Sequence, residues 1–191
     1  SAYNWAYDHA SRYGAPAKKA AVGGDSMGGN FAAIVAQEMR KQRPPTLQLL
    51  IYPGVDFVSD TPSMHDFADA FPQTVEHFMK HYLPAGADPS QPRLSPGRVQ
   101  DLHGLAPALI YTAGFDMLLD QGAAYAERLR EAGVRASYLC FESLPHGFVA
   151  FPSAAPAADP ARVSPAWNSA VRTSPSLVAA SASLDEVGPA S

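Results

Sequence analysis

The sequence of 191 residues contains one cysteine, Cys140, so it cannot form an internal disulfide. Nothing in it therefore demands an oxidising compartment, and we expect a cytoplasmic location. Long hydrophobic runs are also lacking. None approaches the roughly 20 residues that a membrane-spanning helix needs, so no membrane span is expected.

Positive charge is scarce as well. The chain has 14 lysines and arginines against 18 aspartates and glutamates, a formal net charge of -4. A surface that binds a polyanion needs a basic patch, so this balance argues against nucleic acid as a partner. The length favours one domain with a sizeable core.

The hydrophobic pattern alternates short apolar runs with amphipathic segments. Runs such as "LQLLIY" and "ALIYTA" are typical of strands buried on both faces. The expected strands cover residues 20–24, 47–52, 108–113 and 137–141, and the expected helices cover 2–13, 27–40 and about 120–132. This order predicts an α/β domain built on a parallel sheet with flanking helices.

Two segments depart from this alternation. Residues 56–107 form an insert that is too long for a simple crossover, and we expect it to contribute to a cap over one end of the sheet. Residues 152–191 consist largely of alanine, proline and serine, which bury too little apolar surface to offset the entropy of the chain. We therefore predict a domain over residues 1–151 and a disordered tail over 152–191.

The stretch "GDSMG" at residues 24–28 matches G-x-S-x-G, a turn on which many hydrolases hold a nucleophilic serine. An apolar run precedes it and an amphipathic segment follows it, as that role requires. Ser26 is thus a candidate nucleophile, and the backbone N–H of Met27 a candidate oxyanion donor at the start of a helix. The alternative is an ordinary serine in a glycine-rich turn.

A serine nucleophile needs a base and a group that orients the base. In a parallel sheet these are expected at the carboxyl ends of later strands. Asp116 directly follows "ALIYTAGF", and His146 lies in "LPHGF" after the last predicted strand. Asp120 is better placed to cap the following helix or to line the pocket. The other histidines, which we expect to be solvated or packed, are His9, His65, His77, His81 and His103.

The chain order Ser26, Asp116, His146 is that of α/β-hydrolase triads. With this order and with the segments around the three residues, the sequence resembles the hormone-sensitive-lipase-like branch of the α/β-hydrolases. These are microbial carboxylesterases that cleave short acyl esters. The matching segments are "GDSMGGN", "LLIYPGVDF", "PRLSPG", "PALIYTAGFDMLLDQGAAYAERLREAG" and "LPHGF".

The resemblance implies an α/β-hydrolase fold and a serine carboxylesterase, with Ser26 as nucleophile, Asp116 as orienting group and His146 as base. It implies a small-molecule ester substrate and no metal or organic cofactor. Met27 stands where alanine is commoner in the family, and its side chain is expected to narrow the acyl pocket.

The family also places an HGGG-type loop well before the nucleophile, and residues 1–25 contain none. We therefore expect the N-terminal strands of the fold to be missing, which leaves the edge at residues 20–24 open to self-association. Loss of one oxyanion donor lowers turnover by roughly 10² to 10³, so this chain alone is expected to be weakly active or inactive.

Two alternatives to an esterase stay open at this point. A serine peptidase of the prolyl-oligopeptidase type shares the triad order, although the "GDSMGG" and "TAGFD" segments favour the esterase. A non-catalytic fragment, or a subunit that completes its sheet with another chain, agrees with the expected missing strands.

Overall fold

The structure is a computed structural model, and it describes residues 2–68, 80–83 and 85–151. It begins with helix α1 (Ala2–His9) and the 3-10 turn η1 (Ala10–Tyr13), which together fill the helix predicted over 2–13. Gly14 ends the turn with a left-handed φ of 79°, a conformation that glycine adopts at little cost. An ion pair of 2.8 Å between Asp8 and Arg43 anchors this segment to the chain that follows α2.

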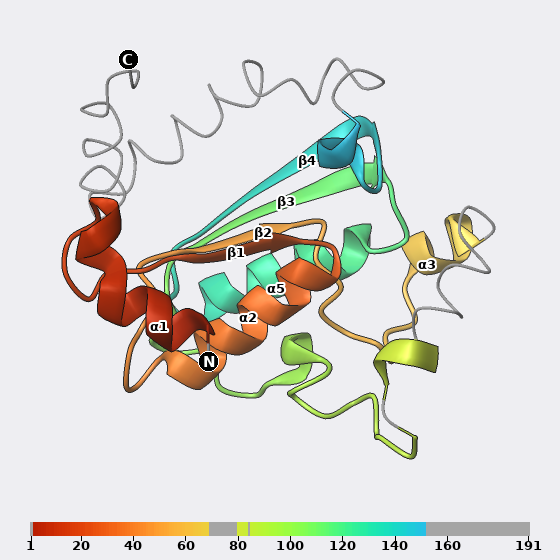
Figure 1. The fold of residues 1–191 in the computed structure, drawn as a ribbon. Coiled ribbons are helices and arrows are strands. Elements are labelled where there is room, and N and C mark those ends of the chain that lie inside the picture. The colour runs from red at the N-terminus through yellow and green to blue at the C-terminus, as the bar shows by residue number, and fades with distance from the viewer. Residues whose placement is uncertain (1, 69–79, 84, 152–191) are drawn as a thin grey trace.

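Four parallel strands form one sheet in the order β1-β2-β3-β4. Gly24, Leu50, Ile110 and Tyr138 lie side by side in one row of the ladder. The parallel arrangement brings the carboxyl ends of all four strands to the same edge (Figure 1). The strands are β1 (Val22–Asp25), β2 (Gln48–Ile51), β3 (Ala108–Phe115) and β4 (Ala136–Pro145). The predicted parallel sheet is confirmed.

Helices α2 (Met27–Met39) and α5 (Leu119–Glu131) cover the same face of this sheet (Figure 1). The strand order runs in one direction without reversal, and parallel crossovers are almost always right-handed. Successive right-handed crossovers in one direction place their helices on one face. Each of the two helices begins at the sheet edge where the strands end, because α2 follows β1 and α5 follows β3 after a few residues at most.

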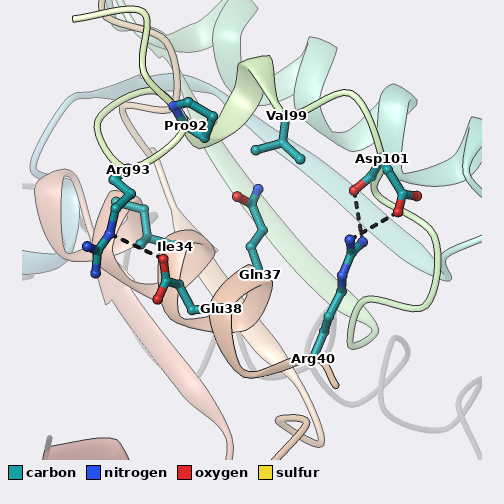
Figure 2. Close-up of a pocket in the computed structure, with 8 residues that line it drawn as sticks. All are labelled: Ile34, Gln37, Glu38, Arg40, Pro92, Arg93, Val99 and Asp101. Atoms are coloured by element: carbon teal, nitrogen blue, oxygen red, sulfur yellow. Dashed lines mark hydrogen bonds and ion pairs between the residues drawn. The ribbon is translucent and has the colours of Figure 1, made fainter. Parts of the chain in front are cut away.

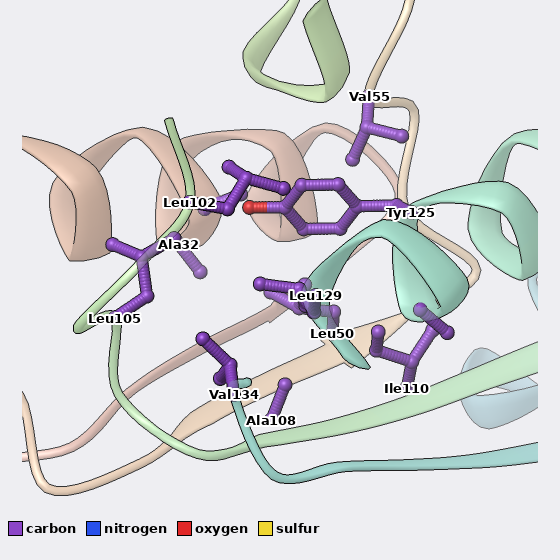
Figure 3. Packing of buried hydrophobic residues seen from close by; sticks show 12 residues of the cluster. Ala32, Leu50, Val55, Leu102, Leu105, Ala108, Ile110, Tyr125, Leu129 and Val134 are labelled. Carbon is purple, nitrogen blue, oxygen red and sulfur yellow. The ribbon is translucent and has the colours of Figure 1, made fainter. Parts of the chain in front are cut away.

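The main core lies between the sheet and these two helices (Figure 3). Leu50 and Ile110 project from the strands and are fully buried, and Tyr125 and Leu129 face them from α5. Each fully buried side chain of this size stabilises the fold by roughly 1.5–3 kcal/mol. From α2 it is the small residues Ala32 and Ala33 that join this core, which lets the helix lie close to the sheet.

The long connection from β2 to β3 contains the short helix α3 (Pro62–Asp66) and the 3-10 turn η3 (Pro96–Arg98). Leu102 and Leu105 from this connection join the core (Figure 3). Arg128 of α5 donates hydrogen bonds to the backbone carbonyls of Gly97 and Val99. The predicted tail at 152–191 lies outside the described residues, and the division of the chain at residue 151 stays a prediction.

Strand β4 is longer than the predicted 137–141 and runs to Pro145. Its pairing with β3 is irregular between Ala113 and Phe115. A bulge of this kind bends a strand and redirects the residues that follow it. The turn η4 (Phe148–Ala150) comes directly after this bent end.

No helix in the described residues is long and apolar enough to cross a bilayer.

Gly114 permits the close approach of β3 and β4 at this irregularity. A Cβ placed there would overlap the backbone carbonyl of Glu142. We expect Gly114→Ala to lower the free energy of unfolding by about 3 kcal/mol, because the backbone of β4 must move aside. Urea denaturation measures this loss. Gly28→Ala is the matched control, since its Cβ meets only Asp25 Oδ1 at 3.8 Å; equal losses in the two variants would contradict the prediction.

Candidate active site

Ser26 occupies the sharp turn between β1 and α2. Its backbone has φ 54° and ψ -117°, a sparsely populated conformation for a residue with a side chain. Such strain costs roughly 1–3 kcal/mol and persists only where the surroundings hold it. The Ser26 N–H donates to the Ile51 carbonyl at 2.9 Å. The hydroxyl is thereby held at the edge where the strands end.

Glycines on both sides of Ser26 make this turn possible. A Cβ at Gly24 would overlap the backbone of Gly28, and one at Gly29 would lie 2.8 Å from the Pro53 Cβ. The backbone of β1, the start of α2 and the loop after β2 therefore approach one another as no larger residue would allow. This crowding explains the first glycine of the G-x-S-x-G motif, Gly24, while Gly28 itself has room for a Cβ.

His146 lies between Ser26 and Asp116. Its Nε2 is 3.0 Å from Ser26 Oγ, and its Nδ1 is 2.7 Å from Asp116 Oδ2. A carboxylate only accepts hydrogen bonds, so Nδ1 donates to Asp116 and Nε2 is left to accept from the serine hydroxyl. The His146 N–H also donates to the Phe115 carbonyl at 3.2 Å. The three residues predicted from separate strand ends meet in one hydrogen-bonded chain.

Asp116 is fully buried, and both of its oxygens are hydrogen-bonded. Oδ2 faces His146, while Oδ1 accepts the N–H of Leu118 at 2.8 Å. A buried carboxylate is costly without such partners. The second bond also fixes the start of α5, for which Leu118 is the capping position.

The prediction that Asp120 caps the helix following it is wrong. Asp120 lies inside the first turn of α5, and the N-cap position, Leu118, makes no side-chain capping bond. Asp120 Oδ2 instead accepts the Ser63 N–H of α3 at 2.8 Å, and Ser63 Oγ donates to the Met117 carbonyl at 3.0 Å. The acidic side chain thus stabilises the N-terminus of a different helix and ties α3 to the loop that carries Asp116.

Met27 is the first residue of α2, so its N–H has no partner within the helix and is available beside Ser26. Its side chain reaches toward the loop after β2. A Cβ built on Gly54 would lie 3.8 Å from Met27 Sδ and 3.6 Å from Leu118 Cδ1. The side chains of Met27 and Leu118 therefore both lie next to Gly54, close to the serine turn.

Sequence reasoning did not identify Asn30 as a site residue. Its side chain is fully buried and donates to the carbonyls of Gly54 at 2.7 Å and Leu94 at 2.9 Å. These bonds attach two loops to the first turns of α2, close to Ser26. An asparagine four residues after the serine carries no general signal for this role, which depends on loops 24 and 64 residues away.

The contacts of His9, His65 and His103 lie away from this centre. His65 pairs with Asp60 at 2.5 Å and His103 with Asp101 at 3.0 Å, both at exposed positions. His9 Nδ1 hydrogen-bonds the carbonyl of Trp5 at 2.8 Å. His77 lies outside the described residues.

A cavity of about 210 Å³ lies elsewhere, between the second half of α2 and residues 92–101. Figure 2 shows two ion pairs across it, Arg93 with Glu38 at 3.2 Å and Arg40 with Asp101 at 3.0 Å. Arg40 also donates to the carbonyls of Asp101 and His103. These charges bind each other and the adjacent loop, and none of the three predicted catalytic residues lines the cavity.

Comparisons with known proteins agree with this architecture. Residues 1–150 match a family model described as the alpha/beta hydrolase fold. The carboxylic ester hydrolase LipN of Mycobacterium tuberculosis is 44% identical over 160 residues, covering 78% of this chain and 43% of that protein. An ethyl acetate hydrolase of Pseudomonas putida is 36% identical over 154 residues, covering 78% of this chain and 48% of that protein.

Among solved structures, an α/β hydrolase enzyme from the metagenome of Lake Arreo, Spain, superimposes with a TM-score of 0.79 at 37% identity. The match covers 84% of this chain and 52% of that one. The chain thus spans about half the length of the relatives it matches. The carboxylesterases among them confirm the resemblance to the hormone-sensitive-lipase-like branch. By its sequence, its sheet and its helices, the chain belongs to the α/β-hydrolase family.

Proposed function

We propose that this chain carries the catalytic centre of a serine carboxylesterase that hydrolyses short-chain acyl esters. The observation that carries the proposal is the hydrogen-bonded chain from Ser26 Oγ through His146 to buried Asp116. A serine hydroxyl is a weak nucleophile unless an adjacent base accepts its proton. The names of the carboxylesterase relatives support the choice of an ester substrate.

In the first half of the reaction, Ser26 Oγ attacks the ester carbonyl carbon while His146 Nε2 takes the hydroxyl proton. Asp116 holds Nδ1–H and stabilises the imidazolium that forms. The tetrahedral intermediate collapses, the bond to the alcohol oxygen breaks, and His146 returns its proton to that oxygen. The alcohol leaves, and the acyl group stays on Ser26.

Water completes the cycle by the same route. His146 Nε2 removes a proton from water, the hydroxide attacks the acyl carbon, and the proton passes to Ser26 Oγ as the acid departs. The negative oxygen of each intermediate needs hydrogen-bond donors. We propose the Met27 N–H as one of them, because the N–H of the first residue of α2 has no hydrogen-bond partner within the helix.

Met27 is also proposed to limit the acyl group. The Met27 side chain directly follows the nucleophile in the chain and lies next to Gly54, as does that of Leu118. This geometry supports a preference for short acyl chains. Apolar pockets discriminate modestly, by roughly 10- to 200-fold per methylene group.

Ester and amide substrates compared side by side test the proposal. Residues 1–191 are expected to release nitrophenolate from p-nitrophenyl butyrate in proportion to protein concentration, slowly, and to release no nitroaniline from an N-acyl-peptide p-nitroanilide. Cleavage of the anilide in preference to the ester would favour the peptidase alternative. No cleavage of either substrate at any protein concentration would contradict the proposal for this chain.

Within the part of the chain that the structure describes, β1 is an edge strand paired only with β2. An open edge favours pairing with another chain, which supports self-association there. Self-association and a cytoplasmic location both stay predictions.

A further inference from the structure

Tyr52, the residue that follows β2, has a strained backbone beside the active site. Its φ is 35°, and among the described non-glycine residues only Lys18 and Ser26 share a positive φ. The Tyr52 N–H donates to the Tyr111 carbonyl at 2.6 Å, and the residue is fully buried. Strain of this kind clusters at functional sites, where the surroundings hold it in place.

The aromatic ring of Tyr52 packs against the imidazole of His146. The two ring centroids lie 4.6 Å apart at an interplanar angle of 54°. The same ring contacts Phe148 at 5.2 Å in an edge-to-face arrangement. Asp116 and Ser26 hold the two nitrogens of His146, and Tyr52 supplies a wall against the ring itself. A wall of this kind restricts the rotation that would carry Nε2 away from the serine.

The hydroxyl of Tyr52 connects the two sides of the active site. It lies 3.4 Å from Asp25 Oδ2, and the backbone of Val149 also hydrogen-bonds it. Burial, followed by the charge of Asp25, raises the pKa of the Tyr52 phenol. The hydroxyl therefore stays protonated and donates to the carboxylate. Asp25 directly precedes the nucleophile, and Val149 follows the histidine by three residues.

We propose that Tyr52 is a positioning residue that fixes His146 relative to Ser26, through its ring against the imidazole and its hydroxyl between Asp25 and Val149. The inference rests on the proposed function for its effect on catalysis. Its effect on the placement of His146 holds whether or not the chain turns over an ester.

Tyr111 provides a matched control on the neighbouring strand β3. It is also buried, at 6% exposure, and its ring packs against Phe141 at 5.8 Å. Among the described residues its hydroxyl has no hydrogen-bond partner. Loss of a buried hydroxyl without a partner costs little or is favourable. Tyr111→Phe therefore removes a similar group at a similar depth without touching the proposed link.

Three variants of the full chain test the proposal: Tyr52→Phe, Tyr52→Leu and Tyr111→Phe. The first readout is the NMR resonance of the imidazole N–H proton of His146 in protein labelled with ¹⁵N-histidine. The hydrogen bond to Asp116 shifts this resonance downfield and protects the proton from exchange with water. The second is kcat and KM for p-nitrophenyl butyrate. Thermal unfolding shows whether each variant is folded.

Tyr52→Leu is expected to lose the protected His146 resonance and to lower kcat by about 100-fold with KM little changed, because a displacement near 1 Å costs about that much. Tyr52→Phe keeps the ring, so a weaker resonance and a loss of about tenfold are expected. Tyr111→Phe should leave both readouts unchanged.

A protected His146 resonance of wild-type strength in both Tyr52 variants would overturn the inference. A change in KM with kcat unchanged would overturn it as well. If Tyr52→Leu does not fold, Tyr52→Phe decides by the same two readouts. Wild-type protein that shows the resonance but cleaves no ester would contradict the proposed function, while the comparison of resonances would still decide the role of Tyr52.

Discussion

Ser26→Ala is expected to abolish ester hydrolysis by this chain, with a loss of at least about 10³-fold that reaches the assay background. The substitution removes the single oxygen that His146 Nε2 can activate at 3.0 Å, and removal of the nucleophile in a serine hydrolase costs up to about 10⁶ in kcat. Hydrolysis of p-nitrophenyl butyrate at saturating substrate measures the loss.

The matched control for this variant is Ser11→Ala, since Ser11 is an exposed serine of the turn η1. It should hydrolyse the ester at the wild-type rate. The backbone of residue 26 already carries strain, and alanine places the same Cβ there, so the fold should be retained. Ester hydrolysis that persists in folded Ser26→Ala would assign the activity to another group.

Asp116→Asn carries the second large expected effect, a fall in kcat of roughly 10⁴-fold, as found when the corresponding group is neutralised in another serine hydrolase. An asparagine amide that donates to Nδ1 forces the proton onto Nε2, and Nε2 then cannot accept the proton of Ser26. The amide oxygen can still accept the Leu118 N–H, which leaves the start of α5 intact.

Asp101→Asn controls for loss of an aspartate bound to a histidine. Asp101 Oδ1 lies 3.0 Å from His103 Nδ1, a similar pairing at an exposed position. This variant should keep the wild-type kcat. If Asp116→Asn stays within about tenfold of wild type, Asp116 does not orient the base.

The site was predictable where it depends on sheet topology. Buried parallel strands deliver their carboxyl ends to one edge, so candidate residues placed just after three separate strands had to meet there. Ser26, Asp116 and His146 were selected in this way, and they form one hydrogen-bonded chain in the structure. Gly24 adds a further signal, because the turn has no room for a larger residue at that position.

The rest of the site depends on contacts between distant segments. Asp120 bonds α3, which lies 57 residues away in the connection from β2 to β3, and no local pattern specifies where that connection runs. Tyr52 combines a positive φ with ring contacts to His146 and Phe148, which lie more than 90 residues further along the chain. The extension of β4 reflects its pairing with β3 beyond the apolar run. Such features follow from tertiary packing and leave no periodic signal.

Covalent capture of Ser26 shows directly whether its hydroxyl is the activated nucleophile. An alkyl phosphonate with a p-nitrophenyl leaving group is incubated with residues 1–191, and the protein is then digested and its peptides are weighed. Attack by Ser26 Oγ forms the phosphorus–oxygen bond and expels p-nitrophenolate, while His146 takes the hydroxyl proton. We expect one adduct per chain, on the peptide that contains Ser26. No adduct, or an adduct on another residue, would contradict this expectation.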